Sequence, residues 1–230
     1  MSKLFVVATP IGNLQDITLR AIETLKNVDI VICEDTRETS KLLSHFNIKK
    51  ELISSNAHNE SKKINSLLER IKSVRSAALV SDAGTPCISD PGVRLINAAI
   101  KENIEIIPIP GVNAAITALS IAGIPTDSFV FEGFPPQKKG RQKFLTNLQN
   151  EKRTIVLYES VYRIEKLLHE INEYLPDRYI CVYRELTKLY EESWRGRPIE
   201  ILQDLPNKIL KGEFVIIISP PDWKSNYSSE

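Results

Sequence analysis

Residues 77–92 read AALVSDAGTPCISDPG, and this stretch sets out the pattern that decides the fold. The apolar run 77–80 is typical of a short buried strand. Residues 81–92 carry two glycines and two prolines, which favour a loop over a regular element. The spacing of apolar residues then predicts a helix over 93–101. A buried strand, a loop and a helix in this order form the repeating unit of an α/β fold.

The same order occurs twice nearer the N-terminus. The apolar run 3–8 ends at a turn, and a helix is expected over 18–26 with Thr18 as its N-cap. A second buried strand is expected over 29–33. Further strands are expected at 52–54 and 105–107, and further helices at 39–46, 61–72 and 113–122. Strands that alternate with helices predict a mainly parallel sheet.

The second half of the chain alternates less strictly. Strands are expected at 129–131, 154–158, 179–184, 190–196 and 213–218, and helices at 140–149 and 161–174. The last three strands follow one another, which favours a mixed sheet. We therefore predict an N-terminal α/β domain over 1–118, a C-terminal α/β domain over 119–222 and a flexible polar tail over 223–230.

The composition is that of an ordinary globular protein, with 42% hydrophobic and 26% charged residues. The formal net charge is +1, so contact with a nucleic acid would need a local basic patch. The three cysteines are far apart and form no C-x-x-C motif. Neither a disulfide framework nor a metal site is expected. The short apolar run at the N-terminus does not fit a signal peptide or a membrane span, so we expect a reducing, cytoplasmic setting.

Several common catalytic signatures are absent from the sequence. It contains no G-x-G, no G-x-x-x-x-G-K-[ST], no G-x-S-x-G and no H-E-x-x-H. These absences argue against dinucleotide binding through a glycine-rich fingerprint, P-loop nucleotide hydrolysis, nucleophile-elbow hydrolysis and zinc peptidase chemistry.

Three loops that follow predicted strands are the evidence for a ligand-binding site. They span residues 8–13, 34–37 and 81–92. Loops after the carboxyl ends of parallel strands meet at one edge of a sheet, where ligands bind. Their small residues allow backbone to approach a ligand closely. Each loop taken alone is also explained as a tight turn.

These loops carry a family resemblance. The stretches VATPIGNL (7–14), EDTR (34–37) and SDAGTPCISDPG (81–92) resemble the ribosomal RNA small subunit methyltransferase I family, within the tetrapyrrole methylase superfamily. The stretches EGF, YES, RELTK and KGEF, which begin at Glu132, Tyr158, Arg184 and Lys211, are similar to that family too. The resemblance covers nearly the whole chain.

The resemblance implies a two-domain, class III methyltransferase fold, S-adenosyl-L-methionine as cofactor and a homodimer. It also implies 2′-O-methylation of a cytidine in the decoding region of 16S rRNA, within the 30S subunit. The cofactor-binding residues that it suggests are Ile11, Asp82, Ala83, Gly84, Thr85, Ile88, Gly111, Asn113, Ala114 and Leu157. The chain departs from the expected family pattern at PGVNA (110–114) and ESVYR (159–163). The resemblance therefore assigns residue roles less directly at these two places.

Methyl transfer to a ribose hydroxyl benefits from a base or from a charge that stabilises the alkoxide. The candidates are Asp35, Glu185 and Lys188. Each has a plainer explanation, because Asp35 could cap the following helix and the other two could form a solvated ion pair. Lys188 would act as a base only if its pKa were depressed.

The segment KKGRQK at 138–143 is the densest basic cluster. Basic residues are poorly placed at the start of a helix, which favours phosphate contact over a solvated helix face. The candidate substrate-binding residues are Arg37, Lys138, Lys139, Arg141, Lys143, Arg163 and Arg184. Two other functions stay open: methylation of a corrin-type tetrapyrrole, and a non-catalytic role in ribosome assembly.

Overall fold

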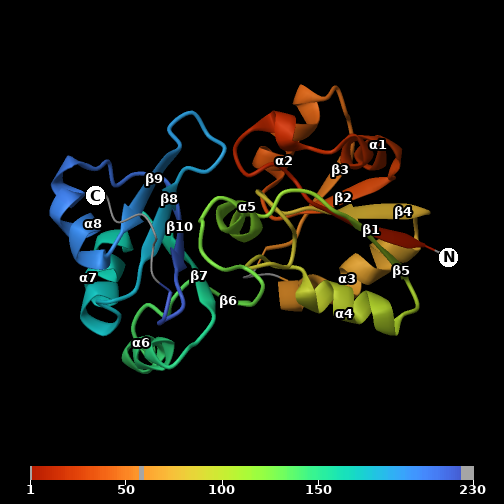
Figure 1. Ribbon diagram of the computed structural model, residues 1–230. Coiled ribbons are helices and arrows are strands. Elements are labelled where there is room, and N and C mark those ends of the chain that lie inside the picture. The colour runs from red at the N-terminus through yellow and green to blue at the C-terminus, as the bar shows by residue number, and fades with distance from the viewer. Residues whose placement is uncertain (1, 57–59, 224–230) are drawn as a thin grey trace. The chain divides into compact units, whose positions relative to one another are not determined.

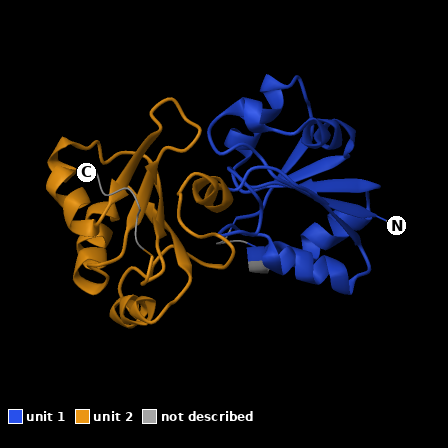
Figure 2. Cartoon of the chain, in the orientation of Figure 1, with its two compact units in different colours: residues 1–113 blue, residues 114–230 orange. Residues whose placement is uncertain are grey.

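The computed structural model describes residues 2–56 and 60–223. The chain divides into two compact units, residues 1–113 and 114–230 (Figure 2). The boundary expected at 118/119 falls inside helix α5 (Ala114–Ser120), which packs on a strand of the second unit and is grouped with it. Of the tail expected at 223–230, only Trp223 lies within the described residues.

The first unit is built on a parallel five-stranded sheet in the order β3-β2-β4-β1-β5. Its strands are β1 (Lys3–Val7), β2 (Ile30–Cys33), β3 (Glu51–Ser54), β4 (Ser76–Leu79) and β5 (Glu105–Ile109). Its helices are η1 (Leu14–Asp16), α1 (Leu19–Asn27), α2 (Thr36–His45), α3 (Glu60–Lys72) and α4 (Val93–Lys101). Helices therefore alternate with strands along the chain, as predicted.

Both faces of this sheet are covered (Figure 1). Alternate strand residues point to opposite faces, so Leu4 packs with the helices α3 and α4, whereas Val7 packs with α1 and α2. The same alternation places Ala77 and Ala78 on opposite faces. Burial on both sides explains why the strands are continuous apolar runs rather than alternating ones.

Side chains outside helices α1 and α4 accept hydrogen bonds from amide groups at the starts of these helices. The Thr18 hydroxyl accepts a hydrogen bond from the Ala21 amide, as the sequence predicts. Helix α4 starts at a glycine without a capping side chain, and the buried Glu60 carboxylate accepts from the Gly92 and Leu95 amides instead. The start of α3 therefore holds the start of α4 and the loop that leads into it.

The second unit has a mixed five-stranded sheet in the order β6-β7-β10-β8-β9. Only β6 and β7 pair in parallel among these neighbours. The strands are β6 (Phe129–Gly133), β7 (Thr154–Ser160), β8 (Ile180–Arg184), β9 (Glu192–Gly196) and β10 (Glu213–Ile218). The other elements are α6 (Arg141–Gln149), α7 (Ile164–Tyr174), α8 (Pro198–Asp204) and η2 (Leu205–Asn207).

The core of the second unit lies between this sheet and the helices α6, α7 and α8. Leu157, Phe214 and Ile216 point into that core and are almost fully buried. Helix α5 packs on the sheet at β10, and the carbonyls of Ile121 and Ala122, just after it, accept hydrogen bonds from side chains of β9 and β8. Within the described residues, no helix has the length and apolar character needed to cross a membrane.

The predicted fold class is confirmed, and each predicted strand and helix is present with shifts at its ends. Among the described residues, the α-helix α8 and the two short 3-10 helices η1 and η2 are missing from the prediction. Helix α8 is only 7 residues long, too short for an apolar period to stand out. Pro198 at its first position and Glu200, which bonds back to the Arg197 amide, mark its start.

Leu95 and Ile100 allow a test of the first core on a single helix. Leu95 is fully buried, whereas Ile100 is 58% exposed. Leu95→Ala should lower the free energy of unfolding by about 2–5 kcal/mol, because it leaves a cavity. Ile100→Ala should change it by less than about 0.5 kcal/mol. Urea unfolding measures both, and equal effects would contradict the packing described above.

Candidate active site

The loops after β1 and β4 are joined by a reciprocal backbone pair. The Thr9 amide donates to the Gly84 carbonyl (2.9 Å) and the Gly84 amide donates to the Thr9 carbonyl (3.0 Å). The Thr9 and Ser81 hydroxyls also donate to carbonyls of the β4 loop. The two loops therefore lie together at the carboxyl edge of the first sheet, as the parallel strands predict.

The loop after β5 joins this pair. The Thr85 hydroxyl donates to the Val112 carbonyl (2.9 Å). A Cβ atom at Gly111 would lie 2.9 Å from the Ala8 Cβ, and one at Gly84 would lie 3.3 Å from Ile11 Cγ2. Gly84 also has a φ of +81°, which side chains disfavour. These contacts explain why glycine occupies both positions.

The loop after β2 adds charge to the same edge. Asp35 caps α2 and pairs with Arg37 (2.6 Å), so the capping alternative describes it correctly. The hydrogen bonds from Arg37 lower the pKa of Asp35 to about 2, which makes this carboxylate a weak base. The Asp82 carboxylate accepts from the Asp35 amide (3.0 Å) and links this loop to that of β4.

The pKa values of Asp82 and Glu34 are raised, whereas that of Asp35 is lowered. Partial burial raises the pKa of Asp82, and the nearby carboxylates of Asp35 and Glu38 add to the rise. Burial likewise raises the pKa of Glu34, with Asp82 and Asp35 contributing. Of Glu34, Asp35 and Asp82, the two with a raised pKa are the better proton acceptors near neutral pH. Sequence alone could not rank them, because the ranking depends on which one the arginine binds.

Most of the candidate cofactor residues lie in this first cluster. Ile11 and Gly84 are buried in it, Thr85 and Asn113 are half-buried, and Gly111 is exposed. Asp82, Ala83 and Ile88 lie on the exposed part of the β4 loop. Ala114 begins α5 of the second unit. Leu157 is different, because its fully buried side chain packs in the core under α6, α7 and α8.

The second unit gathers the remaining motifs at one edge of its own sheet. β7 and β10 pair Ser160 with Glu213, and β10 and β8 pair Phe214 with Arg184. The end of β6 lies beside β7, where Gly133 pairs with Leu157. The EGF, YES, RELTK and KGEF stretches, far apart in sequence, therefore share this edge.

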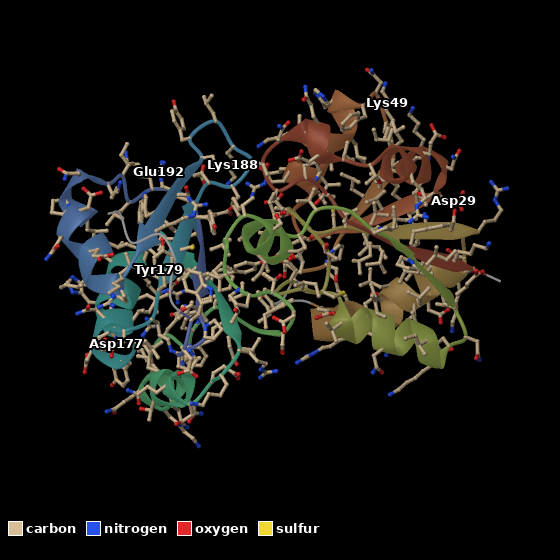
Figure 3. All side chains as sticks on the ribbon, viewed as in Figure 1. Asp29, Lys49, Asp177, Tyr179, Lys188 and Glu192 are labelled. Carbon is tan, nitrogen blue, oxygen red and sulfur yellow. The ribbon has the colours of Figure 1, made fainter. Side chains whose placement is uncertain are left out.

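Lys188 is held in a carboxylate clasp. Its ammonium lies 2.9 Å from both Glu185 and Glu213, on the loop between β8 and β9 (Figure 3). Burial opposes its charged form, but these two hydrogen bonds outweigh burial and raise its pKa. Burial also opposes ionisation of Glu185, but the hydrogen bond from Lys188 helps to lower its pKa. The condition for Lys188 to act as a base is therefore not met in this conformation.

Gly212 makes room for the clasp. A Cβ atom there would overlap the Glu185 carboxylate, and Gly212 has a φ of +97°. Glu185 and Thr187 also have positive φ, a strained backbone that costs on the order of 1 kcal/mol per residue. The KGEF motif marked Gly212 as part of the family resemblance, but it did not predict that Gly212 leaves space for the Glu185 side chain.

The candidate substrate-binding arginines divide by exposure. Arg37 keeps an exposed guanidinium. Arg184 is 7% exposed and donates to the carbonyls of Lys211 and Tyr190. Arg163 pairs with the buried Glu159 (2.7 Å). Arg184 is buried and Arg163 half-buried, and both are paired inside the unit, so in this conformation they hold the structure in place and offer little to a phosphate.

The basic cluster at 138–143 also contains both buried and exposed side chains. Arg141 is 6% exposed and pairs with Glu170, with its Nε atom 2.9 Å from both carboxylate oxygens. Lys138, Lys139 and Lys143 are exposed. The cluster thus offers three free-standing ammonium groups and one internal ion pair.

The comparisons with known proteins agree with this arrangement. The family model described as tetrapyrrole (corrin/porphyrin) methylases matches residues 3–201. A protein from Halalkalibacterium halodurans named ribosomal RNA small subunit methyltransferase I is 48% identical, over 94% of this chain and 75% of that protein. The chain belongs to the ribosomal RNA small subunit methyltransferase I family, within the tetrapyrrole methylases.

Other members and fold neighbours extend the comparison. The family member from Thermotoga maritima is 43% identical over 95% of this chain and 99% of its own length. A uroporphyrin-III C-methyltransferase from Thermus thermophilus, solved with S-adenyl homocysteine, has a TM-score of 0.65 and 15% identity. It covers 94% of this chain and 96% of its own. At that identity the likeness describes the shared fold alone.

Asp35 makes the stability of this family member depend on pH. Its folded pKa of about 2 lies below the ordinary 3.8, so its contribution is present above about pH 4 and is lost as pH falls towards 2. Asp35→Asn keeps a capping side chain but removes the charge. The variant should melt at a lower temperature than the wild type at pH 7 and at the same temperature near pH 2. A gap that stays constant across this range would contradict the assignment.

Proposed function

We propose that the chain is an S-adenosylmethionine-dependent methyltransferase of ribosomal RNA. The finer proposal is 2′-O-methylation of a cytidine ribose in the decoding region of 16S rRNA, within the 30S subunit. The observation that carries it is the 43–48% identity to relatives named for small-subunit rRNA methylation, along a chain whose motif residues gather at two sheet edges. We also propose that the enzyme is a homodimer.

The loop cluster of the first unit suits the cofactor. Gly84 and Gly111 let the loops pack where a side chain would collide with its neighbour, and the exposed backbone at Gly111 can approach a ligand closely. Thr85 and Asn113 add polar groups to the cluster. When bound, the cofactor would supply an activated methyl group. The chain's task is to hold it in line with the attacking oxygen, and Leu157, deep in the second core, would support this only indirectly.

Asp82 is our candidate for the group that accepts the ribose proton. Its raised pKa and its place on the β4 loop favour it over Asp35, whose carboxylate is occupied by Arg37. Lys188 stays protonated in its clasp, so its part would be to supply positive charge at its own sheet edge rather than to act as the base. Glu185 would act through Lys188 by fixing the position of its ammonium group.

Phosphate contacts would come from the exposed lysines Lys138, Lys139 and Lys143, with Arg37 as a further exposed cation. Such contacts position an RNA without reading its sequence. Arg141, Arg163 and Arg184 would support this surface from inside the second unit through their ion pairs and carbonyl contacts.

The deciding experiment is a methyl-transfer assay. Purified protein, with its mass measured by light scattering, is incubated with labelled S-adenosylmethionine and 30S particles from cells that lack the modification. We expect twice the mass of one chain and one labelled ribose, in a cytidine of 16S rRNA. Label on a base, or on a tetrapyrrole offered in parallel, would overturn the substrate. Cofactor binding without transfer to either would favour an assembly role.

Gly84 offers a test of the cofactor cluster. Gly84→Val should abolish the binding of S-adenosylhomocysteine in calorimetry, because the side chain would press on Ile11 and strain the loop. Gly123 also has positive φ, but nothing lies within 4 Å of an added Cβ there. Gly123→Val is therefore the matched control and should keep wild-type affinity. Binding by both variants would remove the first-unit loops from the site.

The base can be identified by substitution. Asp82→Asn should reduce kcat by roughly 10²–10⁴-fold if Asp82 accepts the proton, whereas Asp35→Asn should have a smaller effect. In the wild type, kcat should rise with pH through a pKa above the ordinary aspartate value. Full turnover by Asp82→Asn would mean that the reaction proceeds by alignment alone.

Substitutions can distinguish RNA binding by the exposed lysines from a structural role of the buried Arg141. Replacing Lys138, Lys139 and Lys143 with Gln should weaken 30S binding and reduce its logarithmic salt slope by about 2–3, with little effect on stability. Arg141→Gln should instead destabilise the fold by about 1–3 kcal/mol, because it removes the charge-assisted hydrogen bonds to the half-buried Glu170 and leaves it only Lys166, at 3.8 Å. An unchanged salt slope in the triple variant would show that the lysines are only a solvated surface.

A further inference from the structure

The chain passes from the first unit to the second between Asn113 and Ala114. Three of the candidate cofactor residues, Gly111, Asn113 and Ala114, lie on this crossing segment, residues 111–114. Its conformation therefore matters for the proposed function, on which the following inference rests.

The first unit holds one end of the crossing segment. The Thr85 hydroxyl donates to the Val112 carbonyl, and Gly111 packs so closely on Ala8 that no side chain fits between them. Both contacts come from the loop cluster around Gly84.

Tyr158 of β7 holds the other end. Its hydroxyl oxygen accepts a hydrogen bond of 3.0 Å from the Ala115 amide, in the first turn of α5. The Tyr158 ring is itself confined, because Phe131 and Phe134 meet it edge-on with ring centroids 5.0 and 5.6 Å away. A confined ring gives its hydroxyl a fixed position, so the bond determines where α5 begins.

The far end of α5 is tied to the same sheet. Arg195 donates to the Ile121 carbonyl (3.0 Å), and the Cys181 thiol donates to the Ala122 carbonyl (3.4 Å). These contacts fix the end of the helix but lie several residues from the crossing segment. Tyr158 is thus a residue of this sheet whose side chain bonds next to the candidate cofactor residues.

We propose that Tyr158 is a positioning residue for S-adenosylmethionine. By accepting the Ala115 amide it keeps the crossing segment in the conformation that the cofactor needs, so that binding does not have to order this segment. Losing one such hydrogen bond corresponds to about a 3- to 10-fold loss of affinity.

Tyr158→Phe removes only the hydroxyl and keeps the ring between its aromatic neighbours. We expect KM for S-adenosylmethionine and Kd for S-adenosylhomocysteine both to rise about 3- to 10-fold, with kcat near that of the wild type, because the lost contact does not change during the chemical step. Hydrogen exchange at the Ala115 amide, measured without cofactor, should become faster.

Tyr183→Phe is the matched control. Tyr183 is buried on β8 of the same sheet, and its hydroxyl lies 3.4 Å from Arg195 rather than near the crossing segment. This variant should leave KM and Kd unchanged even if its melting temperature falls as much as that of Tyr158→Phe.

Three results would overturn the proposal: unchanged KM and Kd in Tyr158→Phe, a fall in kcat alone, or an equal rise of KM in Tyr183→Phe. The first would leave Tyr158 as a fold anchor, and the third would indicate general loosening. If the wild type itself bound no S-adenosylhomocysteine, the proposed function would fail first, and the two failures are thereby distinguished.

Discussion

The backbone exchange between Thr9 and Gly84 is the constraint on which the first unit's site depends. It joins two loops that are more than 70 residues apart in the sequence, and it needs a residue at position 84 that tolerates positive φ. Once the loops are joined, Thr85 reaches the β5 loop and Asp82 reaches the β2 loop. The loops that follow four strands are thereby linked in one hydrogen-bonded cluster.

The second unit gathers its motifs by strand pairing instead. Because β10 runs antiparallel to both β7 and β8, its start lies beside their ends. Three of the unit's arginines are buried, with Arg141 on Glu170 and with Arg178 and Arg184 on backbone carbonyls. These three positive charges therefore maintain the fold.

The fold could be predicted from the sequence because its signals are local: apolar runs, helical spacing and glycine- or proline-rich turns. The site was less predictable, because its properties arise between distant residues. The proton affinity of Lys188 depends on Glu213, 25 residues away. A strand that is buried on both faces does not reveal which side Leu157 takes. Likewise, a charge run at a helix start does not show that Arg141 finds Glu170 on α7.

The contact between Gly212 and Glu185 has an evolutionary consequence. The Glu185 carboxylate occupies the volume that any side chain at position 212 would need, and positive φ at 212 adds a backbone penalty. Changes at the two positions are therefore not independent. A larger residue at 212 becomes tolerable after 185 has been shortened, and that step removes one of the two carboxylates that hold Lys188. The order of mutations is thereby restricted, and drift in the KGEF and RELTK segments is expected to be epistatic.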